Sequence, residues 1–352
     1  MKKISECVSP GHPDKVADLI SQYILDRYIE QDPKTRYAVE VLIKGDTVHL
    51  AGEVTSKAYF GYADYKRFVF NALCEIGYTP EYYKAWGGNV IDPVNINVIV
   101  DITAQSGEIG VGVNNEGWGD QGIFFGYADM EGDEYRMPLS HSLAKNLCSM
   151  LYKRAKHWGV GGLDIKTEIV LGEDDKLEKV IAAVPCRDDA EHAKVLDSIL
   201  NWCKYSEGNP VVILNGTGIY KTHGPVADCG VTGRKLAVDF YGGEFQVGGG
   251  AVVKDGTKAD VSLNLYARKL ALKYAHERGE SIKVSLACCI GQNEVDYSVE
   301  TPCGEIIETG TMILKPSEVI SKLGLDKPIY FSMHQFGLFG EFQHMKEWEK
   351  IF

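Results

Sequence analysis

Glycines and cationic side chains stand together in one segment of the chain, residues 228–260. Its cations are Arg234, Lys235, Lys254 and Lys258. Glycines occupy positions 230, 233 and 248–250. Glycine lets backbone N–H groups approach an anion closely, and Arg and Lys neutralise the charge of that anion. The combination predicts a polyphosphate site, although a glycine-rich surface loop with solvated lysines has the same composition.

A second candidate lies near the start of the chain, at Ser9–Lys15. Pro13 suits the first position of a helix, and Asp14 suits the positive end of the helix dipole. His12, Asp14 and Lys15 at a helix N-terminus could bind an anion and a metal ion. The alternative is that these residues only begin a helix.

Composition narrows the classes of function. The chain has 352 residues and a net charge of −12, which argues against a protein that wraps nucleic acid. The start of the chain lacks a signal-peptide pattern, and no apolar run is long enough to span a membrane. The nine cysteines include no C-x-x-C pair, which indicates reduced thiols, no structural zinc and a cytoplasmic location.

Strands and helices that would position these residues follow from hydrophobic periodicity. Residues 36–43 alternate, with Tyr37, Val39, Val41 and Ile43 on one face. Further strands are expected at 47–52, 95–102, 164–171, 179–184, 210–214, 235–241, 281–290 and 295–300. Helices are expected at 16–28, 62–76, 141–157, 189–204, 262–277 and 316–323.

Hairpins therefore begin near residues 36, 164 and 282, roughly 120 residues apart. This spacing predicts an α+β protein made of three related sheet-and-helix units, with helices on one face of each sheet. Length agrees with two or three domains. Sheet faces without helices would need a partner, so we expect an oligomer.

Two features are not explained by three sheet-and-helix units alone. Residues 105–122 hold six glycines, which is typical of an active-site lid or of a plain linker. Glu40 stands in the strand at 36–43 and shares a face with Ala38 and Leu42. A carboxylate there is exposed at an edge or, if buried, needs a cation or hydrogen-bond donors.

Several strings of residues together resemble the S-adenosylmethionine synthase (methionine adenosyltransferase) family. They are Glu6–Lys15, Gly52–Thr55, Gly119–Gly122, Asp228–Lys235, Asp239–Gly243 and Gly248–Gly250. The strings G-H-P-D-K and D-C-G-x-T-G-R-K are long and specific, and all of them occur in the order found in the family. The resemblance extends over most of the chain.

The resemblance implies three α+β domains related by pseudo-threefold symmetry, at about residues 1–110, 111–225 and 226–352, interleaved and with a gating loop over 105–120. It implies a homodimer or homotetramer with active sites at the subunit interface. Its substrates would be ATP and methionine, with two Mg²⁺ per site and K⁺, and with no nucleic-acid or membrane partner. Methionine sulfur would attack the ribose C5′ and expel triphosphate, which is then cleaved to diphosphate and phosphate.

The resemblance also assigns roles to individual residues. Catalytic roles fall on His12, Lys15, Lys166, Arg234, Lys235 and Lys254, with His12 as a donor to the leaving oxygen and the cations on the polyphosphate. Mg²⁺ would be held by Asp14 and Asp260, and K⁺ would be placed by Glu40. Substrates would contact Glu53, Gln105, Asp120, Asp164, Tyr220, Asp228, Ala251 and Lys258. Among these, Glu53, Gln105 and Lys258 would hold the amino and carboxyl end of methionine, and Tyr220 would stack on adenine.

This sequence departs from the family where the anion site is expected. Ile219 and Val261 replace arginines, and Val247 replaces a histidine. Compared with the family pattern, one residue is missing between Ala251 and Lys254. The gating loop is shorter than in the family, and the segment between Glu53 and Gln105 is longer. We expect the nearby Lys221 and His223 to compensate, as cations, for the arginine that Ile219 replaces.

Three other functions compete with a synthase. A paralogue could keep the polyphosphate site but hydrolyse tripolyphosphate or use another nucleotide. A non-catalytic subunit is disfavoured because His12, Asp14, Lys254 and Asp260 are all present. A P-loop nucleotide-binding protein is disfavoured because no G-x-x-x-x-G-K-[ST] string occurs.

Overall fold

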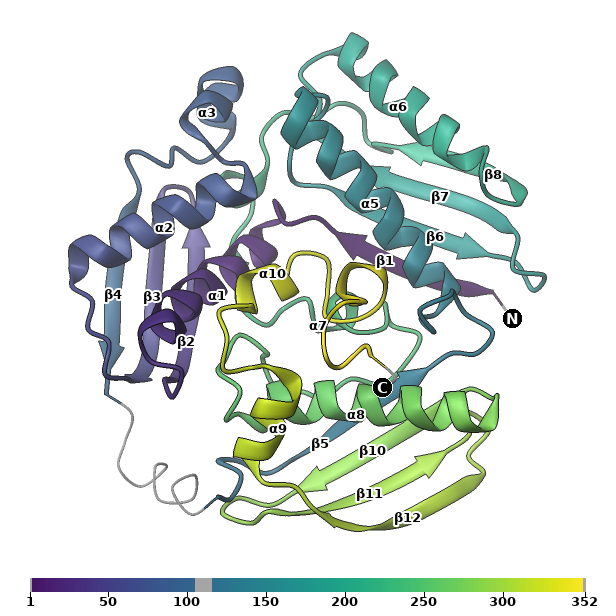
Figure 1. The fold of residues 1–352 in the computed structure, drawn as a ribbon. Coiled ribbons are helices and arrows are strands. Elements are labelled where there is room, and N and C mark those ends of the chain that lie inside the picture. Colours follow the sequence, from purple (N-terminus) through teal and green to yellow (C-terminus); the bar gives the residue numbers. More distant parts are fainter. Residues whose placement is uncertain (1, 105–115, 351–352) are drawn as a thin grey trace.

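The computed structural model describes residues 2–104 and 116–350. Within these residues the strands form three four-stranded sheets, each with helices packed on it. Figure 1 shows the three units arranged around a common centre, with the C-terminal segment (yellow) in the middle. No helix of the described residues is long and apolar enough to cross a bilayer.

The first sheet has the spatial order β4–β3–β2–β9. Its strands are β2 (Arg36–Lys44), β3 (Thr47–Thr55), β4 (Asn97–Thr103) and β9 (Gly230–Val231). β2 and β3 form a hairpin, β4 is parallel to β3, and β9 is antiparallel to β2. The helices of this unit are α1 (Pro13–Gln31), α2 (Tyr62–Ile76) and the short α3 (Pro80–Trp86).

The second sheet has the order β1–β6–β7–β8. Its strands are β1 (Lys3–Val8), β6 (Lys166–Leu171), β7 (Leu177–Ala183) and β8 (Gly208–Leu214), and its helices are α5 (Leu139–Trp158) and α6 (Asp189–Cys203). The directions repeat those of the first sheet, because β8 is parallel to β7 and β1 is antiparallel to β6.

The third sheet has the order β12–β11–β10–β5. Its strands are β5 (Gly122–Ala128), β10 (Ile282–Cys288), β11 (Glu294–Glu300) and β12 (Ile306–Ile313), and its helices are α8 (Ala259–Arg278) and α9 (Pro316–Leu323). All of its neighbouring strands are antiparallel. The difference follows from the connection, because β12 follows β11 through a short turn rather than through a helix.

A common plan underlies the three units. Each has a central hairpin whose first strand is flanked by a strand from a distant part of the chain. One long helix packs on both: α1 on β2 and β9, α5 on β1 and β6, and α8 on β5 and β10. The three-unit α+β architecture predicted from the sequence is therefore confirmed, and the hairpins begin close to the expected residues.

Burial explains why β2 is a strand at this place. Tyr37, Val39, Val41 and Ile43 are buried beneath α1, while Glu40 and Leu42 on the other face are exposed. Helix α1 begins as expected at Pro13, with His12 as its N-cap.

One expected strand is wrong. Residues 235–241 form the short helix α7 (Leu236–Asp239) instead of a strand. The alternation of Leu236, Val238 and Phe240 suits a strand, but the backbone N–H groups of Asp239 and Phe240 donate to carbonyls four residues earlier. Burial of Val238 and Phe240 in the centre of the molecule outweighs the local pattern. Strands β1, β5, β9 and β12 were not expected.

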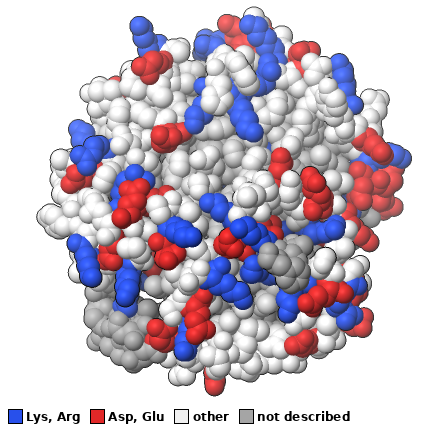
Figure 2. Space-filling view, viewed as in Figure 1, with Lys and Arg blue, Asp and Glu red and all other residues white. Residues whose placement is uncertain are grey.

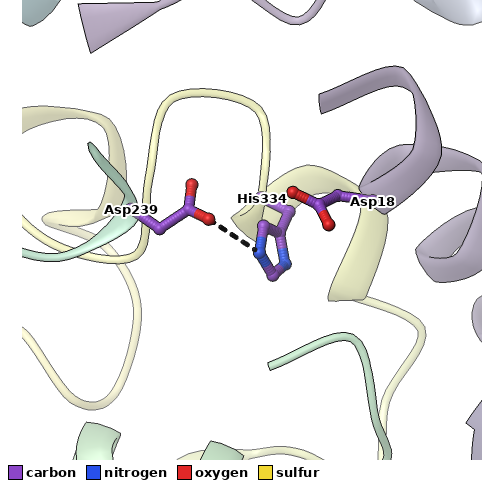
Figure 3. A group of neighbouring side chains, drawn as sticks. All are labelled: Asp18, Asp239 and His334. Carbon is purple, nitrogen blue, oxygen red and sulfur yellow. Dashed lines mark ion pairs between the residues drawn. The ribbon is translucent and has the colours of Figure 1, made fainter. Parts of the chain in front are cut away.

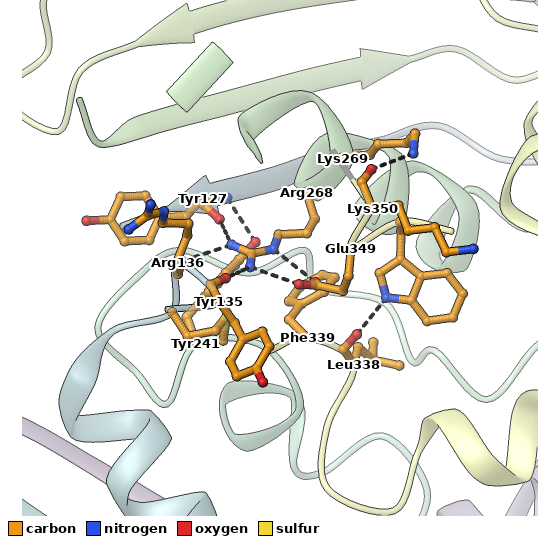
Figure 4. Close-up of polar contacts among 12 residues, drawn as sticks. Tyr127, Tyr135, Arg136, Tyr241, Arg268, Lys269, Leu338, Phe339, Glu349 and Lys350 are labelled. Atoms are coloured by element: carbon orange, nitrogen blue, oxygen red, sulfur yellow. Dashed lines mark hydrogen bonds and ion pairs between the residues drawn. The ribbon is translucent and has the colours of Figure 1, made fainter. Parts of the chain in front are cut away.

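The C-terminal segment holds the units together. Asp26 on α1 accepts hydrogen bonds from the backbone N–H groups of Tyr330 and Phe331, both at 2.9 Å, where α10 (Tyr330–Met333) begins. Arg268 on α8 is fully buried and binds Glu349 at 3.0 and 3.1 Å (Figure 4). Its remaining N–H groups donate to carbonyls of residues 127, 135 and 136, so this buried cation is well satisfied.

Candidate active site

His12 stands at the N-terminus of α1 in a defined protonation state. Its Nδ1 accepts a hydrogen bond from the backbone N–H of Asp14 at 3.2 Å, so the ring proton belongs on Nε2. Burial, and then the charges of Lys235 and Lys166, lower the pKa of His12 to about 3. At neutral pH the ring is therefore a neutral donor through Nε2.

Asp14 lies among the cations of the glycine-rich segment. Its Oδ2 is 2.5 Å from Lys235 Nζ, and its Oδ1 accepts from the N–H of Val231 at 3.0 Å and lies 3.6 Å from Arg234 Nε. Burial raises the pKa of Asp14, but the bonds from Lys235 and Val231 outweigh it and the net pKa is lowered. The two regions identified separately in the sequence therefore meet here.

The loop before α1 is tied to the segment that precedes β6. Ser9 N–H donates to the Ile165 carbonyl, and Ile165 N–H donates to Ser9 Oγ, both at 2.9 Å. Gly11 lies so close that a Cβ there would be 2.4 Å from the carbonyl oxygen of Leu163. These contacts bring the candidate residues Asp164 and Lys166 beside His12.

Asp164 has one satisfied and one unsatisfied oxygen. Its Oδ2 accepts from the N–H of Gly224 at 3.0 Å, whereas its Oδ1 is enclosed and has no hydrogen-bond partner among the described residues. Burial, with smaller contributions from the carboxylates of Asp228 and Asp14, raises the pKa of Asp164 to about 6, although the N–H of Gly224 and the charge of Lys166 lower it. We call the set His12, Asp14, Asp164, Lys166, Arg234 and Lys235 the α1 cluster.

Lys15 does not join the α1 cluster. Its side chain is 1% exposed, and its Nζ lies 2.6 Å from Asp239 and 3.3 Å from Asp18. His334 Nε2 lies 3.5 Å from the other oxygen of Asp239 (Figure 3). Ligand atoms of Asp18, Asp239 and His334 lie within 4.8 Å of one another, a spacing that suits a metal ion. However, the ammonium of Lys15 already supplies a cation to both carboxylates.

This buried group also supports the anion site. Asp18 Oδ1 accepts from the N–H of Gly233 at 2.9 Å, directly before Arg234 and Lys235. Asp18 and His334 were not recognised from the sequence, because their contacts with Gly233 and Asp239 join distant segments and no local pattern marks them.

A second group lies at the N-terminus of α8, and we call Asp120, Lys254, Lys258 and Asp260 the α8 cluster. Lys254 Nζ is 2.8 Å from Asp260 Oδ2, and Lys258 is the N-cap residue of the helix. Burial raises the pKa of Cys288 to about 12, with contributions from Asp120 and Asp260. The thiol of Cys288 also donates to the Asp120 carbonyl at 3.4 Å, so Cys288 links Asp120 to Asp260.

Glu40 and Glu53 lie on the face of the first sheet that α1 does not cover. Glu40 pairs with Ala51 and Glu53 pairs with Ala38, so the two carboxylates share that face in adjacent strands. Glu40 is exposed and accepts a hydrogen bond from the hydroxyl of Thr232. Thr232 belongs to the D-C-G-V-T-G-R-K string, but the sequence did not reveal its contact with Glu40.

The remaining candidates are placed less closely. Tyr220 is partly buried and its carbonyl accepts from Cys186 N–H at 3.0 Å, while Asp228 is exposed and Ala251 is partly buried. Gln105 and most of the predicted gating loop, residues 105–115, lie outside the described residues. The end of that loop is anchored, since Trp118 is buried and its N–H donates to the Gln292 carbonyl at 2.9 Å.

The structure also shows where the residues that depart from the family pattern lie. Ile219 is 36% exposed, whereas Val261 lies on α8 and is buried in the core, and Lys221 is exposed. The expectation that His223 acts as a cation is wrong. Its side chain is 0% exposed, and burial lowers the pKa of His223 to about 4, so the ring is neutral at physiological pH.

Charged residues of both signs are interspersed over the face shown in Figure 2. The candidate site also combines charges of both signs. Each cluster contains an aspartate held by a lysine, Asp14 by Lys235 and Asp260 by Lys254. Both arrangements suit a ligand that carries phosphate together with a metal ion.

Comparison with known proteins agrees with this geometry. Residues 2–107, 115–205 and 222–350 match the N-terminal, central and C-terminal domains of S-adenosylmethionine synthetase. A relative from Mycoplasmopsis synoviae (strain 53) named S-adenosylmethionine synthase is 34% identical, covering 100% of this chain and 96% of the relative. One with the same name from Pseudothermotoga lettingae is 33% identical, covering 100% and 97%.

A solved structure shows the same fold. It is described as an unusual S-adenosylmethionine synthetase from Campylobacter jejuni. The TM-score is 0.87 at 30% identity, and the match covers 99% of this chain and 97% of the other. The three domain matches, the full-length relatives and this structural likeness show that the chain belongs to the S-adenosylmethionine synthase family, whose members are methionine adenosyltransferases.

Proposed function

We propose that this chain converts ATP, L-methionine and water to S-adenosylmethionine, phosphate and diphosphate. The observation that carries the proposal is the α1 cluster, in which a neutral His12 donor stands beside Lys166, Lys235 and Asp14. Family membership supports the same reaction.

The residues suit the difficult step of this reaction. The sulfur of methionine forms a bond to the ribose C5′ while the bond from C5′ to the triphosphate oxygen breaks. A thioether has no proton to lose, so no general base is needed, and the charge that develops on the triphosphate is the main demand. His12 Nε2–H donates to the leaving oxygen, and Lys166, Arg234, Lys235 and Lys254 stabilise the charge. Water then cleaves the triphosphate into diphosphate and phosphate.

Metal ions fit the two aspartates. Asp14 is buried and charged, and it pairs with the ammonium group of Lys235, as Asp260 pairs with that of Lys254. The side chains of these two lysines are 20% and 21% exposed and can move aside for a metal ion, unlike the buried Lys15. We assign Mg²⁺ to Asp14 and Asp260, two ions per site, because Mg²⁺ prefers carboxylate and phosphate oxygens. Bound there, Mg²⁺ would neutralise phosphate charge. We assign K⁺ to Glu40, whose exposed carboxylate is oriented by Thr232.

The substrates are assigned to both clusters. Asp164 offers its unpartnered Oδ1 to a hydroxyl of the ribose, and Tyr220 offers its ring to adenine. Methionine is assigned to Glu53, Gln105 and Lys258, with Asp120 and Asp228 between the two substrates.

The uncovered sheet faces favour an oligomer. The sheet faces that carry no helices expose apolar side chains, Ile4, Val211 and Ile213 on the second sheet and Leu42 and Ile99 on the first. Glu40 and Glu53 lie on this face of the first sheet, so a partner subunit would cover them. We therefore propose a homodimer or homotetramer with the active site at the interface. All nine cysteines are free, which supports a cytoplasmic location.

The test is direct. Purified protein is incubated with ATP, methionine, Mg²⁺ and K⁺, and S-adenosylmethionine is measured by liquid chromatography. If none forms while tripolyphosphate or another nucleoside triphosphate is hydrolysed, the paralogue with altered specificity replaces this proposal. If the protein is monomeric while fully active, the interface site is wrong.

A further inference from the structure

A tyrosine and a histidine from distant segments meet beside the α1 cluster. The hydroxyl of Tyr82 on α3 lies 2.7 Å from Nε2 of His223, and it accepts a hydrogen bond from the backbone N–H of Leu163 at 3.0 Å. One side chain therefore joins α3 to two separate loop segments.

The direction of each hydrogen bond follows from the partners. His223 Nδ1 is 2.7 Å from the carbonyl oxygen of Lys221, which can only accept, so Nδ1 carries a proton. Because the buried ring is neutral, Nε2 is an acceptor and takes the O–H of Tyr82. The Tyr82 oxygen then accepts from Leu163, which leaves every polar atom of the pair satisfied.

Aromatic packing fixes the same pair. The ring of Trp86 lies 4.7 Å from that of His223 at an interplanar angle of 78°, and the ring of Tyr78 lies 5.7 Å from that of Tyr82 at 84°. The hydroxyl of Tyr78 donates to the carbonyl of Gly11 at 2.6 Å, next to His12. The pair is thus part of a rigid aromatic group that reaches the proposed catalytic histidine.

The pair determines where Asp164 points. Tyr82 holds Leu163, the residue before Asp164, while His223 precedes Gly224, whose N–H donates to Asp164 Oδ2 at 3.0 Å. Gly224 has φ +63, and a Cβ there would lie 2.3 Å from the Tyr78 hydroxyl. Only glycine therefore fits this turn, which packs directly against the aromatic group. Asp164 is held from both sides, and its Oδ1 is buried without a hydrogen-bond partner among the described residues, so it is the acceptor left for a ligand.

We propose that Tyr82 and His223 are positioning residues for the nucleoside half of the active site. They orient Asp164 and hold the segment that carries Tyr220, where Ile219 supplies no guanidinium. His223 N–H donates to the Asn89 carbonyl at 3.0 Å, which ties this segment to the chain after α3. The inference rests on the proposed function, because it assumes that Asp164 contacts ATP.

The variant Tyr82→Phe tests it, since phenylalanine keeps the ring packing and removes only the hydroxyl. We expect KM for ATP to rise about tenfold, the change expected for ~1.4 kcal/mol of binding. KM for methionine and the hydrolysis of tripolyphosphate, which has no nucleoside, stay within twofold of the parent protein. His223→Gln, which can still accept from Tyr82, has a smaller effect on KM for ATP than His223→Ala.

Tyr83→Phe is the matched control, because Tyr83 is the next residue of α3 and is only partly buried. The inference is overturned if Tyr82→Phe leaves KM for ATP unchanged, or if it lowers thermal stability and all activities equally. Failure of the parent protein to make S-adenosylmethionine would instead reject the proposed function. In that case calorimetric binding of ATP by parent and Tyr82→Phe proteins decides the inference, since equal affinities overturn it and weaker binding by the variant supports it.

Discussion

Lys15 and Asp239 form an ion pair of 2.6 Å in which both side chains are only 1% exposed. Burial lowers the pKa of Lys15, but the carboxylates of Asp239 and Asp18 outweigh it and the net pKa is raised. The ammonium is therefore charged and fully engaged. The resemblance to the family suggested a polyphosphate ligand, whereas the contacts make Lys15 a structural link between α1 and α7.

Replacing Lys15 by Met should destabilise the protein. The change leaves Asp239 and Asp18 buried without their cation, which typically costs about 3–5 kcal/mol. Chemical denaturation monitored by circular dichroism measures the loss. Lys273→Met is the control, because this lysine is 46% exposed and its surface pair with Glu277 contributes ~0.5 kcal/mol or less. If the Lys15→Met variant is as stable as the parent protein but no longer binds tripolyphosphate, Lys15 is a polyphosphate ligand after all.

His12→Ala should reduce kcat for S-adenosylmethionine formation by about 100-fold to 1000-fold, the usual effect of removing one preorganised donor. Because the pKa of His12 is about 3, the ring stays neutral above pH 5, and its titration should not shape the pH profile of the parent protein. Rapid-quench kinetics measures kcat, and His157→Ala on the exposed side of α5 is the control. A parent profile with an inflection near pH 6.5 that disappears in His12→Asn would contradict the neutral donor.

Asp164 should make ATP binding dependent on pH. The pKa of this carboxyl is about 6, so the carboxylate form predominates at pH 7.5 and the protonated form predominates at pH 5. Protonation removes an acceptor, and KM for ATP is therefore expected to rise as pH falls through 6, about tenfold for each pH unit below it. Asp164→Asn should flatten this dependence, whereas Asp197→Asn on the exposed surface should keep it. An equal slope in Asp164→Asn would assign the titration to another group.

Glu40→Gln should weaken activation by K⁺ without changing the requirement for Mg²⁺. Glutamine keeps the size of the side chain and its contact with the Thr232 hydroxyl but removes the charge. We expect the K⁺ concentration for half-maximal activity to rise at least about tenfold. Initial rates over a K⁺ series at fixed Mg²⁺ measure this, with Glu277→Gln on the exposed side of α8 as the control. A shift in the Mg²⁺ series instead would mean that Glu40 serves the divalent ions.

The helices and the central hairpins could be predicted because their patterns are local. In β2, alternating Tyr37, Val39, Val41 and Ile43 have only one face to bury, so the periodicity decides the structure. The helix start at Pro13 followed from a proline, an aspartate and a histidine within three residues.

Residues with long-range partners could not be predicted in this way. Leu236–Phe240 alternates like a strand, but the ion pair of Asp239 with Lys15 and the burial of Phe240 select a short helix. His223 was expected to be a cation that compensates for the arginine replaced by Ile219. Its neutral state depends on Tyr82 and Trp86, which lie about 140 residues earlier and carry no sequence signal of this role.

Strand pairing between distant segments has a consequence for biosynthesis. β1 at residues 3–8 cannot pair until β6 at 166–171 has been made, β2 waits for β9 at 230–231, and β5 waits for β10 at 282–288. No unit is completed by a continuous stretch of chain, so a nascent protein exposes open strand edges until translation has passed about four-fifths of its length. Such high contact order predicts slow folding, dependence on chaperones during synthesis, and aggregation of truncated products.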